Sequence, residues 1–558
     1  MFAALLAAAQ ALAFGWVRWP LSASFGFVPG DDFDMQLSLL EAIGRCWRAG
    51  VLPGWNPWTA GGVPLLANPE APVFHPLGLL AAFVPAETLL RLSVGAHWCV
   101  AFAGTGLLAQ QLARQAGAGR GSASLTGIVS MVGLASTDVL VSRAAAGHAT
   151  MLQAAWIPMA LWLAGRPTAW PAALAISAAL YGGGPQVAFF AALAVGLRMA
   201  LDGLQDRSRW LALLGVGGLT ALLALPRLVT TALAMDGLDR FVWPTPTGAL
   251  VAPTLGEALA RVGFGGTLAP RPEGGHNGLP ALLLPLWPAL AALGAWVLRR
   301  RPAAPVALGL LFLLSLGDLS PVPLYRWMHA LPPLDRLRFP DRLALAWVPL
   351  LCAVGGVGAM LWIRHWLSQA VVALGLVSFT LWAAGQHRAP WQIDPGRPVV
   401  VSAAHAPPPP VEEPLAAPTF VEGRPRTNLH AVRSNASCLG CQDATESAAR
   451  PGRAVGPYPL RGGVTLVAWS PGRIDLEVGV AGPLPLPESA RPGWRATDPQ
   501  GREVLLSKAD DGSLVVHPDR PGRVRLRYTP PGLWAALGGT LGGLILLVWW
   551  RSRSPRLA

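Results

Sequence analysis

Charged residues are scarce in this chain. They make up 13% of its 558 residues, whereas hydrophobic residues make up 53%. A soluble domain usually carries about 25% charged residues. The length alone would suggest several soluble domains, but long uncharged apolar runs exclude that interpretation. The sequence therefore predicts a polytopic α-helical membrane protein.

Lysine is almost absent, since Lys508 is the single lysine among 43 basic residues. The net charge of +13 would suit a nucleic-acid-binding protein, but the arginines are distributed differently. They form short clusters between apolar segments, as the positive-inside rule expects for cytoplasmic loops. We therefore expect no nucleic-acid partner. The Ala, Gly, Pro and Arg-rich composition is typical of a high-GC bacterial gene, which favours the bacterial inner membrane.

Cysteine is also rare. Of the five cysteines, Cys46, Cys99 and Cys352 are isolated, and Cys438 and Cys441 form a lone CxxC pair. A structural zinc site needs further ligands. Because this segment is expected outside the cytoplasm, a local disulfide is favoured over a free pair.

Apolar runs long enough to form membrane helices recur along the whole chain. The first of them has no basic residues before it, so we expect an uncleaved helix and no cleavable signal peptide. About twelve segments qualify: 2–20, 88–112, 123–141, 148–165, 168–183, 185–201, 208–232, 279–298, 303–317, 342–361, 366–385 and 531–550.

The connections between these segments alternate in character. With the N-terminus inside, the arginine clusters fall on the cytoplasmic side, and the long connections 21–87, 233–278 and 318–341 face outward. Three parts follow: a multi-pass transmembrane domain (1–385), an extracytoplasmic β-sandwich-like domain (386–530), and a final helix with a basic tail (531–558). Alternating apolar residues predict strands at 463–468, 473–478, 503–506, 513–516 and 523–528.

The first outer loop carries the most distinctive polar residues. Asp31, Asp32 and Asp34 lie within four positions, where they repel one another and need water, protons or a cation. One interpretation is a hydrated acidic start of the amphipathic helix 33–49. The other is a catalytic carboxylate that accepts a proton from an attacking hydroxyl group. The rigid turns that follow, such as Trp55-Asn56-Pro57, favour a loop of fixed shape.

Several motifs together resemble one family. They are Asp32-x-x-x-Gln36, Leu52-Pro-Gly-Trp-Asn-Pro57, Gly61-Gly-Val-Pro-Leu-Leu-Ala-Asn-Pro-Glu70, Gly147-His148, Gly183-Gly-Pro-Gln186, 316–342, Arg491-Pro-Gly-Trp494 and Tyr528-Thr-Pro-Pro-Gly532. In this order they resemble the bacterial YfhO-like membrane proteins of the C-type (GT-C) glycosyltransferase superfamily. The resemblance extends over nearly the whole chain. Relatives often read G-H-P-Q where this chain has Gly184-Pro185-Gln186.

The resemblance implies an inverting sugar transfer on the outer face of the membrane. The donor would be a polyprenyl-phosphate-linked sugar, and the acceptor an envelope polymer, lipid or protein. Asp32 would be the catalytic base and Asp31 its helper, while Asp34 would remain a solvated cap. If a metal takes part, it is Mg²⁺ or Mn²⁺ held by Asp31 and Asp32, because carboxylates are hard ligands.

Other polar residues are candidates for substrate binding. Arg338 and Arg342 suit the phosphate of the donor because arginine binds phosphate with two parallel hydrogen bonds. They would equally suit anchors that extend to the membrane surface. The remaining candidates, for each of which a structural role is the alternative, are Gln36, Trp55, Asn56, His148 and His276.

Two other functions stay open. A transporter or flippase for lipid-linked intermediates would carry ionisable residues within its helices, and these helices have few of them. The second of these functions is that of a non-catalytic scaffold with the same architecture.

Overall fold

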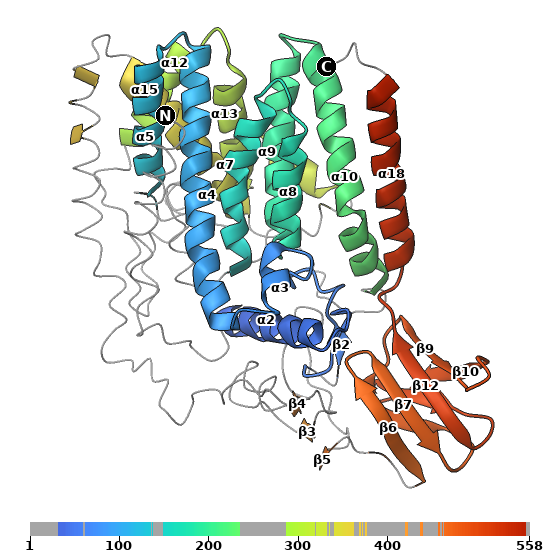
Figure 1. Ribbon diagram of the computed structural model, residues 1–558. Helices are drawn as coiled ribbons and strands as arrows, with labels where there is room; N and C mark the ends of the chain where they lie inside the picture. The colour runs from blue at the N-terminus through green and yellow to red at the C-terminus, as the bar shows by residue number, and fades with distance from the viewer. Residues whose placement is uncertain are drawn as a thin grey trace, which may run out of the picture.

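The computed structural model describes residues 32–59, 62–135, 137, 149–234, 286–317, 320–331, 334, 340–361 and 463–553, with short pieces between 368 and 460. Figure 1 shows a bundle of helices with a β domain next to one of its ends. The expected division into three parts stays a prediction from the sequence.

Helices occupy every expected apolar segment except 2–20 and 366–385, which lie wholly or largely outside the described residues. Most boundaries differ from the expected ones by a few residues, and the segment at 148–165 begins as the 3-10 turn η1 (Ala149–Ala155). The helices are α4 (Ala86–Gln115), α5 (Arg120–Ala135), α7 (Trp156–Ala164), α8 (Pro171–Tyr181), α9 (Pro185–Gly203), α10 (Ser208–Ala234), α12 (Leu286–Val297), α13 (Ala303–Ser315), α15 (Ala344–Leu361) and α18 (Leu533–Arg553).

Four of these helices, α4, α9, α10 and α15, are long and apolar enough to cross a membrane. Others are shorter; α8 has 11 residues and would extend only about 16 Å. The outer faces of α10 and α18 expose large apolar side chains, including Leu214 at 70% and Val548 at 68%. Exposed apolar faces of this kind are typical of helices that contact lipid.

The arginine-rich connections gather at one end of the bundle. Arg209 donates a hydrogen bond to the carbonyl oxygen of Arg166 at 2.9 Å, and Gln205 donates one to the carbonyl oxygen of Arg300 at 3.4 Å. The first loop and the β domain lie at the other end (Figure 1). The arginine-rich connections and the first loop therefore lie at opposite ends of the bundle, as expected. The side of the membrane that each end faces stays a prediction.

The first loop contains the expected amphipathic helix, α2 (Asp32–Arg48). In Figure 1 it lies crosswise below the bundle, next to the short helix α3 (Pro76–Leu80). Glu41 forms ion pairs with Arg45 at 3.6 Å and Arg48 at 3.4 Å. Arg48 also donates to the carbonyl oxygen of Ala81 at 3.1 Å, which ties the end of α2 to the segment after α3.

The β domain is one continuous sheet of seven strands in the order β6-β7-β12-β9-β10-β11-β8. The strands are β6 (Val464–Ser470), β7 (Arg473–Val478), β8 (Leu484–Ser489), β9 (Trp494–Thr497), β10 (Glu503–Lys508), β11 (Ser513–His517) and β12 (Gly522–Tyr528). The sheet curls into a half-barrel whose apolar side chains share a single core. A second sheet of three short strands contains β3 (Thr419–Val421), β4 (Ala436–Cys438) and β5 (Gly456–Pro457).

The curled sheet differs from the expected sandwich in two ways. The described strands 464–528 form one sheet instead of two stacked sheets, because β10 pairs with both β9 and β11. The strands β8 and β9 were not expected from the sequence. β8 contains Pro485 and Pro487, which a strand tolerates at the edge of a sheet, where β8 lies. β9 has only four residues and is too short to show a clear alternation.

Candidate functional site

The acidic cluster lies at the start of α2. Asp32 and Asp34 are in the first turn of this helix, but the structure does not describe their side chains. Asp31, His148, His276 and Arg338 lie outside the described residues, as does Cys441 of the CxxC pair. Gln36, Trp55, Asn56 and Arg342 are described.

Gln36 connects α2 to the loop that follows it. Its side chain is buried, with 4% exposed, and its Nε2 atom donates to the carbonyl oxygen of Glu70 at 3.4 Å. The backbone amide of Glu70 in turn donates to Oδ1 of Asn68 at 2.9 Å. The Asp32-x-x-x-Gln36 and Asn68-Pro69-Glu70 motifs are therefore in direct contact, 34 residues apart in sequence.

A buried arginine of α10 holds the same loop from the other side. Arg227 Nη1 donates to the carbonyl oxygen of Leu66 at 2.8 Å, and Nη2 donates to that of Ala71 at 2.7 Å. Thr231, one helical turn further, donates to the carbonyl oxygen of Ala67 at 3.0 Å. These bonds fix the backbone on both sides of the Asn68–Glu70 turn. An ionisable residue inside the apolar run 208–232 is the sequence signal that could have identified Arg227.

The glycine motif before α9 packs against this turn. Gly183 has a positive φ of 92°, and a Cβ atom there would collide with the carbonyl oxygen of Glu70. A Cβ atom on the neighbouring Gly182 would likewise collide with the side chain of Gln153 in η1. Glycine is required here because the backbones approach closely and because a left-handed conformation disfavours other residues.

Arg342 joins the site from the start of α15. It lies in the 3-10 turn η4 (Pro340–Leu343), and its Nη1 atom donates to Oε1 of Gln186 at 2.9 Å. Gln186 belongs to the glycine motif that contacts Glu70. Contacts thus run from Gln36 through Glu70 and Gly183 to Gln186 and Arg342, which brings four of the sequence motifs together.

Two buried histidines lie behind the loop. His75 and His97 stack with ring centroids 6.2 Å apart. His75 Nδ1 accepts a hydrogen bond from the backbone amide of Leu77 at 3.3 Å and so caps α3, which leaves the proton of the neutral ring on Nε2. Burial, reinforced by the neighbouring His97, lowers the pKa of His75 to about 3. His75 is therefore neutral at physiological pH and cannot serve as a cationic phosphate ligand there.

Trp55 and Asn56 are both buried, but each lies in a different environment. Trp55, with 1% exposed, lies in the core of the β domain. Asn56 is fully buried; it donates to Thr59 Oγ1 at 3.1 Å and accepts from the amide of Trp58 at 3.1 Å. Asn56 thus shapes its own turn, and Trp55 joins the loop to the β domain. Trp494 packs in the same core.

The structure offers no test of the expected cation. Within the described part of the chain, no group of three or more His, Cys, Asp or Glu side chains is arranged to hold a metal ion. The residues expected to bind it, Asp31 and the side chain of Asp32, lie outside that part. The cation therefore remains a prediction from the sequence.

Comparisons with known proteins give a weak likeness. No family model and no curated protein matches the chain. Among solved structures, the crystal structure of the Archaeoglobus fulgidus oligosaccharyltransferase in the apo form is similar, with a TM-score of 0.41 and 15% sequence identity. The match covers 70% of this chain and 55% of that chain, so it spans about half the length of that protein. A likeness of this size does not assign a function.

Proposed function

We propose that this protein is a membrane glycosyltransferase of the GT-C type, as its sequence motifs suggest. It would move a sugar from a polyprenyl-phosphate-linked donor to a cell-envelope acceptor, with inversion, on the outer face of a bacterial inner membrane. Asp32 would act as the general base and Asp31 would assist it. Arg342, together with Arg338, would bind the phosphate of the donor.

The observation that supports this proposal is the convergence of motifs that are far apart in sequence. Gln36 bonds to Glu70, Gly183 packs on Glu70, and Gln186 bonds to Arg342. A loop held on both sides by α2 and Arg227 has a fixed backbone. A rigid frame around a general base is what transfer chemistry requires, because the base must stay within hydrogen-bond reach of the acceptor hydroxyl.

The buried arginines of the helices weigh against transport. Arg198 in α9 is 1% exposed and donates to the carbonyl oxygen of Leu161 at 2.6 Å, and Arg227 donates to the loop carbonyls. Both residues lie toward the C-terminal ends of their helices and hold backbone groups. Residues along a transport pathway would instead lie at mid-membrane depth and face a hydrated cavity.

The test replaces Asp32 by Asn, which keeps the shape of the side chain and removes its basicity. Membranes containing the Asp32→Asn variant should lose transfer of labelled sugar from lipid-linked donors to the envelope fraction, by about 100-fold or more. Asp34→Asn is the matched control and should keep transfer within about twofold of wild type. Unchanged glycosylation in a folded Asp32→Asn protein would contradict the assignment and favour the transporter or the scaffold.

A further inference from the structure

The outer face of the curled sheet carries arginines on three neighbouring strands, β7, β12 and β9. On these strands the core side chains alternate with outward-facing ones. Arg527 of β12 pairs directly with Arg473 of β7 on one side and with Arg495 of β9 on the other. All three side chains are exposed. We call these three residues the arginine row.

A row of this kind is unfavourable by itself. Like charges directly opposite one another in a sheet repel and destabilise the pairing. One member of the row has an acidic partner, since Asp475 forms ion pairs with Arg473 at 3.5 Å and with Arg523, further along β12, at 3.1 Å. Among the described residues, the side chains of the other two members, Arg495 and Arg527, form no ion pair or hydrogen bond. An external anion would therefore relieve the repulsion at this end of the sheet.

The arginine row lies at the end of the sheet that is attached to the bundle. Arg527 precedes Leu533, the first residue of α18, by six positions, which an extended chain covers in at most about 20 Å. α18 has 21 residues and a length of about 31 Å, close to the thickness of the hydrocarbon core. Figure 1 shows β12 running toward the lower end of α18. The row thus lies near the depth at which lipid headgroups begin.

From this placement we infer that the arginine row docks the β domain on the headgroups of anionic phospholipids. The phosphate groups there supply the negative charge that the sheet lacks, and arginine binds them with two parallel hydrogen bonds. Each arginine near an anionic membrane surface strengthens attachment by about fivefold in binding constant. This docking is independent of sugar transfer, and it would hold the β domain at a fixed height above the membrane.

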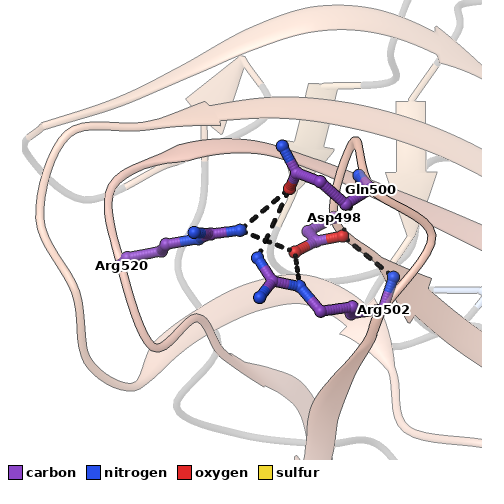
Figure 2. Close-up of polar contacts among 4 residues, drawn as sticks. All are labelled: Asp498, Gln500, Arg502 and Arg520. Atoms are coloured by element: carbon purple, nitrogen blue, oxygen red, sulfur yellow. Dashed lines mark hydrogen bonds and ion pairs between the residues drawn. The ribbon is translucent and has the colours of Figure 1, made fainter.

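Figure 2 shows the internal control, a polar cluster of Asp498, Gln500, Arg502 and Arg520. These residues lie in the turn between β9 and β10 and in the turn before β12. There Arg502 and Arg520 both bond to the carboxylate of Asp498, at 2.8 and 3.2 Å. These two arginines share the carboxylate of Asp498, and they lie in turns at the ends of β9 and β12 that point away from α18. They should not respond to the charge of the lipid.

The experiment is arginine modification by phenylglyoxal, read by mass spectrometry, on the full chain in nanodiscs. Phosphatidylglycerol should slow modification of Arg495 and Arg527 at least fivefold relative to phosphatidylcholine, and high salt should remove the protection. Arg502 and Arg520 should change less than twofold. Equal rates in both lipids would overturn the proposal. Protection by inorganic phosphate alone in phosphatidylcholine nanodiscs would also overturn it, in favour of a soluble anion.

A second measurement uses variants. The double variant Arg495→Gln/Arg527→Gln should retain fewer bound phosphatidylglycerol molecules than wild type in native mass spectra of the detergent-solubilised chain. The matched double variant Arg502→Gln/Arg520→Gln should retain the wild-type number. The same retention in both variants would contradict the assignment of the row.

Discussion

Trp55 of the first loop donates a hydrogen bond from Nε1 to the carboxylate of Glu488 at 2.9 Å, across 433 residues of sequence. Its ring also packs on Trp494 and Tyr528, with centroids 5.1 and 4.6 Å away. The core of the β domain is therefore completed by a residue from the loop that begins with the acidic cluster. Through Trp55, the position of the β domain and the shape of this loop depend on one another.

Replacing Trp55 by Ala should separate the β domain from the loop. A large buried aromatic replaced by Ala costs about 3–5 kcal/mol, so the apparent melting temperature in detergent should fall and proteolysis at 463–528 should accelerate. Trp55→Phe keeps most of the packing and loses only the bond to Glu488, so it should recover most of the stability. Wild-type protease resistance in Trp55→Ala would contradict this coupling.

Replacing Arg227 by Met should loosen the Asn68–Glu70 turn. The carbonyl oxygens of Leu66 and Ala71 would lose their donors inside the protein, at a cost of about 1–3 kcal/mol each. The expected readouts are a lower melting temperature and new proteolytic cuts within 62–75. Arg209→Met, which removes an exposed bond at the other end of the bundle, should change stability by less than about 0.5 kcal/mol. Equal effects of the two substitutions would show that Arg227 does not fix the turn.

Replacing Gly183 by Ala should displace the turn from the opposite side. The positive φ of 92° costs an alanine about 1–2 kcal/mol, and its Cβ would press on the carbonyl oxygen of Glu70. The lower stability of Gly183→Ala should appear as a lower melting temperature in thermal unfolding. Gly196→Ala in α9 is the control, because a Cβ there meets nothing within 4 Å; it should be neutral or stabilising by up to about 1 kcal/mol. If both variants melted alike, the close approach at Gly183 would be unimportant.

The low pKa of His75 predicts acid sensitivity. The folded protein holds this ring neutral down to a pKa of about 3, whereas the ordinary pKa of histidine is 6.5. Below pH 6.5 the unfolded chain therefore binds the proton more readily, and stability falls as the pH drops from about 6.5 toward 3. His75→Asn keeps an acceptor for the amide of Leu77 and removes the titration. Its melting temperature should depend less on pH between 7.5 and 5 than that of wild type, and an unchanged pH dependence would contradict this explanation.

The sequence by itself determined the local elements. Uncharged apolar runs located α4, α5, α7, α8, α9, α10, α12, α13, α15 and α18, and amphipathic spacing located α2. Alternation located β6, β7, β10, β11 and β12. These features are decided by side-chain periodicity within a short window, which needs no knowledge of distant residues. The separation of arginine-rich connections from the first loop was likewise readable from composition.

Only the tertiary structure decided what the polar residues contact. Trp55 belongs to the β-domain core, and Arg227 holds a loop more than 150 residues away. β8, with its two prolines, becomes a strand because an edge position in the sheet accepts it. Each of these contacts joins segments far apart in sequence and leaves no periodic pattern. Their placement depends on which surfaces meet when the bundle and the sheet pack together.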